Sequence, residues 1–151
     1  MDSYEINTDT LALIPINVNT TKVLEKDKEL YINLSTMKII KNSCEYFGSS
    51  YLGRFSGTKK LIGVSHKAPI IIEETNNIIF FPTTSPRLTE CVWINLKNII
   101  NYKKCNGKTL IIFENNIKLE LNISYGSFDN QVLRSYKLDS ILRKRKETIK
   151  I

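Results

Sequence analysis

The stretch from Cys44 to Lys67 constrains the fold more than any other part of this chain. It reads C-E-Y-F-G-S-S-Y-L-G-R-F-S-G-T-K-K-L-I-G-V-S-H-K and holds four of the six glycines and the only histidine. Each glycine weakens a strand or a helix interior, so the stretch predicts neither an ordinary strand nor a long helix. Glycine also lets backbone N–H groups approach a ligand closely, which suits the oxygens of a phosphate.

The second half of this stretch is strongly basic. Between Arg54 and Ala68 the chain carries three lysines, one arginine and no acidic residue. We therefore predict a basic, glycine-rich loop that binds anions. The alternative is a helix–turn–helix corner with a solvated basic rim, and the residues leave both open. A DNA-reading form of that corner is disfavoured, because its second helix would contain Gly53 and end at Gly57.

Composition indicates one globular domain over residues 1–151. The chain is 42% hydrophobic and 25% charged, as expected for a folded protein of this length. The net charge of +7 is uneven. One basic region is Arg54–Ala68, and the other is Arg134–Ile151, with seven Lys or Arg residues against two acids. This distribution favours nucleic acid as a partner first and an anionic membrane surface second.

Nothing in the sequence predicts a membrane span, a secretory signal or a metal site. No window reaches the roughly 18 apolar residues of a membrane helix, and the segment Met1–Glu5 lacks a basic signal-peptide region. We therefore expect a cytoplasmic protein. The three cysteines, Cys44, Cys91 and Cys105, contain no C-x-x-C pair, and we expect them to be reduced and structural.

Alternation and turn signals predict an α+β fold, built mostly from antiparallel hairpins in a single meander-like sheet. Pro15 cannot donate to a ladder and is expected at an edge or a bulge. Asn106-Gly107 is the strongest hairpin signal in the chain. About seven or eight strands are predicted, over Thr10–Val18, Lys22–Glu25, Glu29–Leu34, Pro69–Glu73, Ile78–Phe81, Cys91–Leu96, Thr109–Phe113 and Ile117–Leu121. Ile99–Lys103 either extends the strand Cys91–Leu96 or forms a partner for it.

Two helical regions interrupt or follow these strands. A short helical insertion is predicted near residues 36–56. Its first helix is capped by Ser35 and stops at Gly48, and a second short helical turn covers Ser50–Phe55. A C-terminal helix is predicted to begin at Ser127, with Asp129 in its first turn and a basic last turn. Its expected buried stripe is Phe128, Val132, Tyr136, Leu138, Ile141 and Leu142.

The sequence contains no constellation that predicts catalysis. Neither G-x-G-x-x-G nor the phosphate-binding G-x-x-x-x-G-K-[ST] motif is present. His66 has no carboxylate partner nearby in the sequence, and a Cys44–His66 nucleophile pair has little support. We therefore expect a binding module, with no cofactor, and not an enzyme.

Several longer motifs resemble those of the ComK family of bacterial competence transcription factors. They are S-Y-E-I-N (Ser3–Asn7), C-E-Y-F-G-S-S-Y-L-G-R (Cys44–Arg54), G-T (Gly57-Thr58), S-H-K-A-P-I (Ser65–Ile70), F-P-T (Phe81–Thr83), W-I (Trp93-Ile94) and I-S-Y-x-S-F-x-N-Q-V-x-R (Ile123–Arg134). The resemblance covers nearly the whole chain in register.

The resemblance implies a sequence-specific DNA-binding activator of DNA-uptake genes. It also implies binding to paired A/T-rich boxes, largely through the minor groove, by dimers that pair into a tetramer. A/T tracts narrow the minor groove and attract arginine, which suits the two basic regions. The candidate DNA-binding residues, chosen here by charge and placement, are Ser49, Ser50, Arg54, Lys59, Lys60, His66, Lys67, Arg87, Arg134, Arg143, Lys144, Arg145 and Lys146.

The chain departs from the family at its C-terminus, because family members continue past the position of Ile151. The family's tail is where the adaptor of a Clp protease is thought to engage. Control by that adaptor is therefore not expected here, and a shortened paralogue with weak activation is one alternative. The other alternative is a module that binds an anionic membrane or protein through the basic C-terminal helix.

Overall fold

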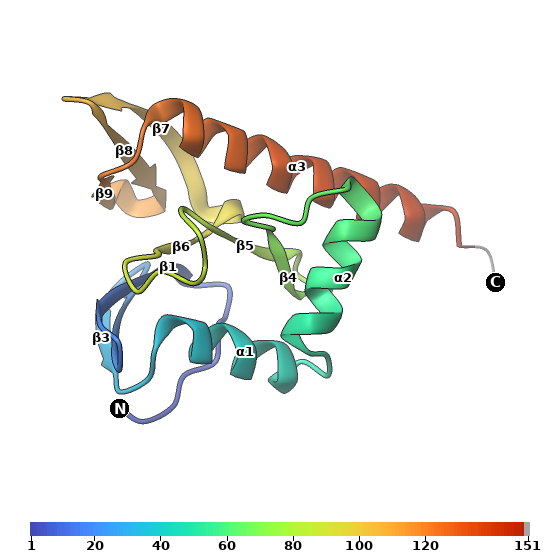
Figure 1. Cartoon of the computed structure of the whole chain (residues 1–151), viewed down its shortest axis with the longest axis horizontal. Coiled ribbons are helices and arrows are strands. Elements are labelled where there is room, and N and C mark those ends of the chain that lie inside the picture. Colours follow the sequence, from blue (N-terminus) through green and yellow to red (C-terminus); the bar gives the residue numbers. More distant parts are fainter. Residues whose placement is uncertain (150–151) are drawn as a thin grey trace.

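The computed structural model describes residues 1–149, so residues 150–151 of the predicted domain lie outside the described part. The predicted α+β class, with antiparallel hairpins and a C-terminal helix, is confirmed (Figure 1). The strands are β1 (Thr10–Asn17), β2 (Thr20–Glu25), β3 (Glu29–Ile32), β4 (Ile70–Glu73), β5 (Ile78–Pro82), β6 (Trp93–Asn95), β7 (Ile99–Cys105), β8 (Lys108–Phe113) and β9 (Lys118–Leu121). The helices are α1 (Thr36–Tyr46), α2 (Tyr51–Ile62) and α3 (Tyr125–Glu147), with 3-10 helices η1 (Leu96–Asn98) and η2 (Glu114–Asn116).

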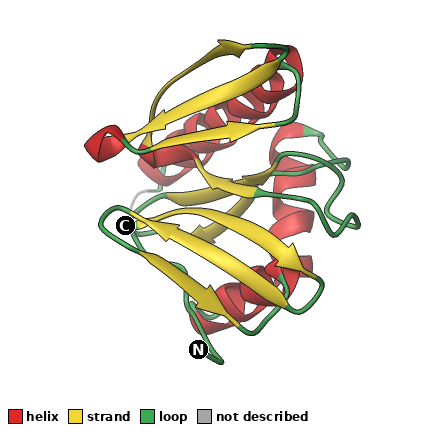
Figure 2. Cartoon of the chain, turned by 90° about the vertical axis from the view of Figure 1, so that its left-hand side faces the viewer, coloured by secondary structure: helices red, strands yellow, loops and turns green. Residues whose placement is uncertain are grey.

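The strands form two antiparallel sheets, so the prediction of a single sheet is wrong. Their orders are β3-β2-β1-β6-β5-β4 and β7-β8-β9, and Figure 2 shows them as separate groups of strands. The break falls at η1, where the side chain of Asn95 accepts a hydrogen bond from the N–H of Lys97. This turn redirects the chain after β6, and Ile99 then begins a strand that pairs with β8.

The six-stranded sheet is buried on both faces, and neighbouring residues of its strands belong to two different cores. Phe80 and Trp93 lie on the face covered by α1 and the N-terminal segment. Phe81 and Ile94 lie on the opposite face, against α3 and the three-stranded sheet. Because side chains alternate across a strand, burial on both faces requires the nearly continuous apolar runs of β4 and β5.

The predicted hairpins are confirmed, including the turn at Asn106-Gly107. Both turn residues have positive φ, at 50° and 76°, as a type I′ turn requires. Pro15 lies in β1, which is hydrogen-bonded to β2 on one side and to β6 on the other. The pairing of β1 with β2 is irregular between Pro15 and Asn17. The expectation of a bulge near this proline therefore holds, although β1 is not an edge strand.

Helix α1 begins and ends as predicted. The Ser35 hydroxyl accepts a hydrogen bond from the N–H of Lys38 at 3.1 Å. Gly48 has a φ of 84° just after the helix, a conformation that glycine adopts without strain. The side chains of Ile40 and Cys44 are buried against the sheet.

The prediction of a loop after Phe55 is wrong, because α2 continues through both glycines to Ile62. The Ser50 hydroxyl caps its first turn by accepting from the N–H of Gly53 at 3.0 Å. The helix ends at Gly63, whose φ is 72°. Packing outweighs the low helix propensity of glycine here, because α2 contributes side chains to the cores on both faces of the sheet.

Helix α2 crosses the edge of the six-stranded sheet beside β4 (Figure 1). Tyr51 and Phe55, near its beginning, pack against the core beneath α1. Leu61 and Ile62, at its end, pack against the core beneath α3. The helix–turn–helix corner weighed as the alternative to a loop is therefore the arrangement that the structure adopts.

Helix α3 begins earlier than predicted. Its N-cap is Ser124 instead of Ser127, because the Ser124 hydroxyl accepts from the N–H of Ser127 at 3.2 Å. Asp129 therefore lies beyond the first turn, where it accepts a hydrogen bond from the Tyr102 hydroxyl at 2.6 Å. Tyr136 is exposed and does not belong to the buried stripe, whereas Phe128, Val132 and Leu138 do.

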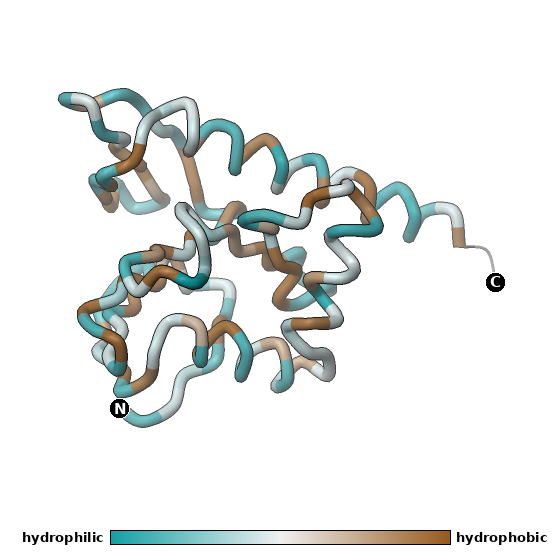
Figure 3. The backbone as a smooth tube through the Cα atoms, in the orientation of Figure 1, coloured by the Kyte–Doolittle hydropathy of each residue, from teal (hydrophilic) through white to brown (hydrophobic). Residues whose placement is uncertain are grey.

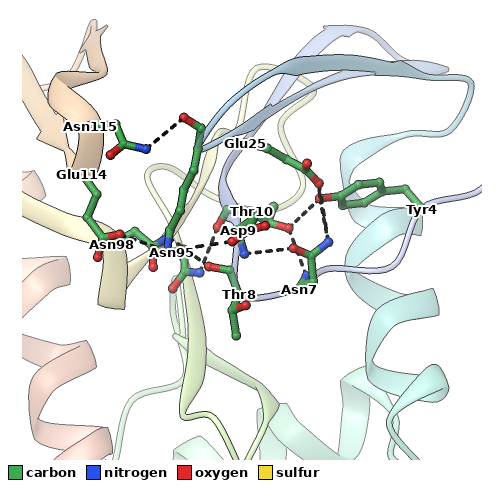
Figure 4. A network of polar contacts seen from close by, with 11 residues as sticks. Tyr4, Asn7, Thr8, Asp9, Thr10, Glu25, Asn95, Asn98, Glu114 and Asn115 are labelled. Carbon is green, nitrogen blue, oxygen red and sulfur yellow. Dashed lines mark hydrogen bonds and ion pairs between the residues drawn. The ribbon is translucent and has the colours of Figure 1, made fainter.

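A buried polar network ties the N-terminal segment to the sheet (Figure 4). The Tyr4 hydroxyl donates to the carboxylate of Glu25 and shares a hydrogen bond with Thr10. The Asn95 side chain donates to the carbonyl of Thr10 at 2.9 Å, and that of Asn98 donates to the carbonyl of Thr8. Burial and the carboxylate partner raise the pKa of the Tyr4 phenol well above its usual range.

Apolar residues concentrate between the sheets and helices, while the last turns of α3, which extend past α2, are mostly hydrophilic (Figure 3). Among residues 1–149, no helix combines the length and the apolar character needed to cross a bilayer.

Candidate nucleic-acid interface

A groove of about 840 Å³ lies between the α1–α2 corner and two loops. One is the 63–69 loop, between α2 and β4, and the other is the 83–92 loop, between β5 and β6. The residues that line the groove come from the α1–α2 corner and from these two loops: Met37, Lys41, Glu45, Ser50, Tyr51, Leu52, Phe55, Ser65, His66, Lys67, Ala68, Ser85, Pro86 and Arg87.

The groove brings together four of the predicted residues, Ser50, His66, Lys67 and Arg87. They are separated by up to 37 positions in the sequence, and only the tertiary structure places them around one cavity. Lys41, on α1, adds a cation that the sequence analysis missed, because it lies outside the two basic regions. Glu45 is the one acidic side chain among the groove residues.

Aromatic side chains form part of the groove between these cations. The rings of Tyr51 and Phe55 are stacked, with centroids 6.3 Å apart. Both residues are half-buried and pack against the core beneath α1. Cations around an aromatic floor can hold an anionic partner that also presents flat or apolar surface, as nucleic acids do.

The 63–69 loop is held in place by side chains that donate to its carbonyl groups. Thr58, buried on α2, donates to the carbonyl of Pro69 at 2.6 Å. Gln131, fully buried on α3, donates to the carbonyl of Lys67 at 2.8 Å. Lys67 has a φ of 52°, an uncommon conformation for lysine that persists because the surroundings fix it.

Sequence reasoning missed Gln131 and Thr58 because it selected residues by charge. Both lie within motifs that carried the family resemblance, G-T at Gly57-Thr58 and the N-Q-V run within Ile123–Arg134. A polar residue on the expected apolar stripe, as Gln131 is between Phe128 and Val132, is a signal that could have identified one of them, because buried donors require fixed partners.

Arg54 and Arg134 are turned toward the protein. The guanidinium of Arg54 pairs with Glu74 at 3.0 Å, and its side chain is 18% exposed. Arg134 donates to the carbonyl of His66 and to the side-chain oxygen of Gln131, both at 3.1 Å. In this arrangement both arginines stabilise the chain around the groove, and neither lines it.

The remaining candidates lie outside the groove. Ser49 is half-buried in the α1–α2 turn, where its N–H donates to the carbonyl of Cys44 at 2.9 Å. Lys59 and Lys60 are exposed in the last turn of α2, which favours cations through the helix dipole.

The basic residues at the end of α3 form a second group. Arg143 pairs with Asp139 at 2.9 Å on the same helix, and Lys146 donates to the carbonyl of Glu74 at 3.3 Å. Lys144 and Arg145 are exposed. No residue of α3 lines the groove, so the basic residues at the end of this helix lie apart from the groove cations.

The region beside the groove does not assemble a reactive cysteine. Cys44 is fully buried, and burial raises the pKa of its thiol to about 11. Burial also raises the pKa of Cys91, which is likewise buried. Both side chains are therefore protonated and poorly nucleophilic at neutral pH. Among residues 1–149, no three His, Cys, Asp or Glu side chains are grouped to hold a metal ion.

Comparison with known proteins gives two matches to this chain. The family model described as "ComK protein" matches residues 1–147. The "Competence transcription factor" of Bacillus subtilis (strain 168) is 39% identical over 139 residues, which cover 89% of this chain and 72% of that protein. No solved structure matches the chain.

Proposed function

The chain belongs to the ComK family, and we propose on this basis that it is a DNA-binding transcription regulator that activates competence genes. The observation that carries the proposal is the 39% identity to a protein named as a competence transcription factor. The net charge of +7 and the cations around the groove support it physically, because the phosphate backbone supplies most of the affinity of DNA-binding proteins.

The groove is the proposed reading surface. Arg87, exposed on the 83–92 loop, is the proposed minor-groove reader, because narrow A/T-rich minor grooves concentrate negative potential that attracts arginine. Lys41 and Lys67, from α1 and the 63–69 loop, are the proposed phosphate contacts on either side of it. Ser50 and His66 add the small polar donors that suit the degenerate pattern of that groove.

Exposed basic residues outside the groove are proposed to contact flanking phosphates. Lys59 and Lys60 are exposed at the end of α2, and Lys144 and Arg145 near the end of α3. Contacts of this kind position a protein on the duplex without reading its sequence. Binding of paired A/T boxes by a dimer, and the pairing of dimers into a tetramer, stay predictions. The cytoplasmic location, with association to the nucleoid when DNA is bound, and the absence of catalytic activity also stay predictions.

A mobility shift at fixed salt tests the proposal. A promoter fragment with paired A/T boxes is compared with a probe in which the boxes carry G·C pairs. We expect tighter binding to the A/T probe and competition by a drug that occupies the minor groove. Equal retention of both probes would reduce the activity to non-specific binding.

Matched lysine and arginine variants locate the reading surface. Arg87→Ala is expected to lower the preference for the A/T probe by about 1–3 kcal/mol. Lys144→Ala is expected to weaken binding to both probes alike and to lower the salt slope by about 1. Lys118→Ala, an exposed lysine of β9 in the other sheet, is the control and should change neither quantity.

A further inference from the structure

We infer that Gln131 is a positioning residue that joins the two cationic loops of the groove into one rigid binding edge. From α3 its side chain reaches the 63–69 loop and the end of β5, from which the 83–92 loop departs. The amide nitrogen donates to the carbonyl of Lys67 at 2.8 Å. It also donates at 2.7 Å to the carbonyl of Pro82, the last residue of β5 before the 83–92 loop. A single buried group thus connects the backbone beside Lys67 with the strand end that leads to Arg87.

The chemistry of a glutamine amide fits this place closely. Its two N–H donors are both used by backbone carbonyls, and its oxygen accepts from the guanidinium of Arg134 at 3.1 Å. Arg134 in turn donates to the carbonyl of His66, the next carbonyl along the same loop. A glutamate carboxylate could not donate, and an apolar residue would remove the donor from one part-buried and one buried carbonyl, which is costly.

The position of Gln131 makes the connection rigid. The residue is 0% exposed, and it lies between Phe128 and Val132, which are anchored in the core beneath α3. Thr58 holds the far end of the 63–69 loop through the carbonyl of Pro69. The loop is thereby fixed from α2 and from α3, independently of any partner.

For DNA, the consequence rests on the proposed function. The 63–69 loop is held against the strand end that leads to Arg87 before DNA arrives, so ordering this edge costs less on binding. Specific contacts depend on such positioning by a supporting layer of residues, whereas contacts to phosphates through flexible side chains depend on it far less. Gln131 should therefore govern sequence preference more than overall affinity.

The first measurement is amide hydrogen exchange on the full chain without DNA. Gln131→Met keeps the length of the side chain and removes its donors, and Val132→Ala shortens a neighbouring buried side chain of the same helix without removing a hydrogen bond to either loop. We expect Gln131→Met to increase exchange by roughly tenfold to a hundredfold in the 63–69 loop and around the start of the 83–92 loop together. Val132→Ala should not increase amide exchange in both loops together. Gln131→Asn, which keeps the donors but is shorter, replaces Gln131→Met if the latter does not fold.

The second measurement is the affinity ratio between the A/T and G/C probes. Gln131→Met is expected to lower this ratio by about tenfold, the order lost with one base-reading contact, while the salt slope stays unchanged because no cation is removed. The inference is overturned if Gln131→Met increases amide exchange in only one of the two loops, or if Val132→Ala increases exchange in both loops as much. It is also overturned if Gln131→Met leaves the affinity ratio between the A/T and G/C probes unchanged. If the unsubstituted protein itself prefers neither probe, the proposed function fails, and the exchange experiment still decides the inference about Gln131.

Discussion

At the scale of single residues, the side chains that fix the groove are buried and uncharged, whereas the cations it displays are more exposed. Thr58 and Gln131 are fully buried and donate to backbone carbonyls. Arg87 and Lys41 reach solvent from the rim. Burying an unpaired charge is costly, so cations stay at the surface and neutral donors satisfy the carbonyls beneath them.

Thr58→Val tests the weight of one such donor. The substitution keeps the shape of the side chain and leaves the carbonyl of Pro69 without its 2.6 Å hydrogen bond. We expect a loss of about 1–3 kcal/mol in the free energy of unfolding, measured with urea. Thr75→Val, on the exposed turn between β4 and β5, is the control and should cost little. Equal effects at both positions would contradict the role of Thr58.

The cysteines give a pH-dependent prediction. Cys44 has its thiol pKa raised by burial from 9.0 to about 11, so the unfolded chain loses this proton first as pH rises. The stabilising contribution of Cys44 is therefore present below pH 9 and decreases between pH 9 and about 11. Tyr4, whose phenol pKa is also raised by burial, acts in the same direction at higher pH.

Unfolding curves across this pH window measure the effect of Cys44. Cys44→Ala should lose less stability than the unsubstituted protein between neutral pH and pH 11, after allowing for its lower starting value. At pH 8, a thiol reagent should modify the half-buried Cys105 first, and Cys44 and Cys91 only on unfolding. Rapid labelling of all three thiols in the folded protein would contradict this account.

At the scale of elements, α2 shows how packing overrides local propensity. Two glycines lie in its interior, yet the helix runs from Tyr51 to Ile62 because its two ends are anchored in different cores. Gly63 then ends it in the left-handed region. The glycines at positions 53 and 57 have no such backbone requirement, so they differ only in their surroundings.

Alanine substitutions distinguish these two glycines. A Cβ at Gly57 would meet nothing within 4 Å, so Gly57→Ala should stabilise the protein by about 0.5–1 kcal/mol. A Cβ at Gly53 would lie 3.0 Å from the Ser50 hydroxyl that caps the helix. Gly53→Ala should therefore gain less or destabilise, because it disturbs a cap worth about 1 kcal/mol. The free energies of unfolding of both variants are measured with urea. Equal gains in stability would contradict the expectation that the methyl group at position 53 disturbs the Ser50 cap.

At the scale of the whole molecule, the six-stranded sheet is the shared wall of two cores. Asn98, in η1 between the two sheets, donates to the carbonyl of Thr8 in the N-terminal segment. Asn95, in β6, donates to the carbonyl of Thr10 in β1. Lys26, at the end of β2, also pairs with Glu114 after β8 at 3.0 Å. The two sheets are therefore connected by partly exposed polar contacts as well as by apolar packing.

We predict from this that the chain unfolds as one domain. The fluorescence of Trp93, in the six-stranded sheet, should follow the same denaturant transition as hydrogen exchange in β7–β9. Asn98→Ala should lower stability by about 1–2 kcal/mol and shift both transitions equally, because it removes a contact between the N-terminal segment and η1. Two separate transitions would instead show that each sheet folds independently.

The sequence by itself determined the parts of this protein that depend on neighbouring residues. The Asn106-Gly107 turn, the Ser35 cap, the stop at Gly48 and the hairpins on either side of the corner all follow from local backbone preferences. Turn and cap residues act within a few positions, so their effects can be recognised without knowing what packs against them. The motifs also sufficed for the family, which the matches confirm.

Only the tertiary structure decided what depends on partners distant in the sequence. It made α2 a helix through two glycines, placed β7–β9 in a sheet separate from the other six strands, and turned Arg54 toward Glu74. It also placed Arg87 beside the 63–69 loop and Gln131 beneath it. These outcomes depend on cores and hydrogen bonds formed between distant segments, and charge or propensity read along the chain carries no information about which segments will meet.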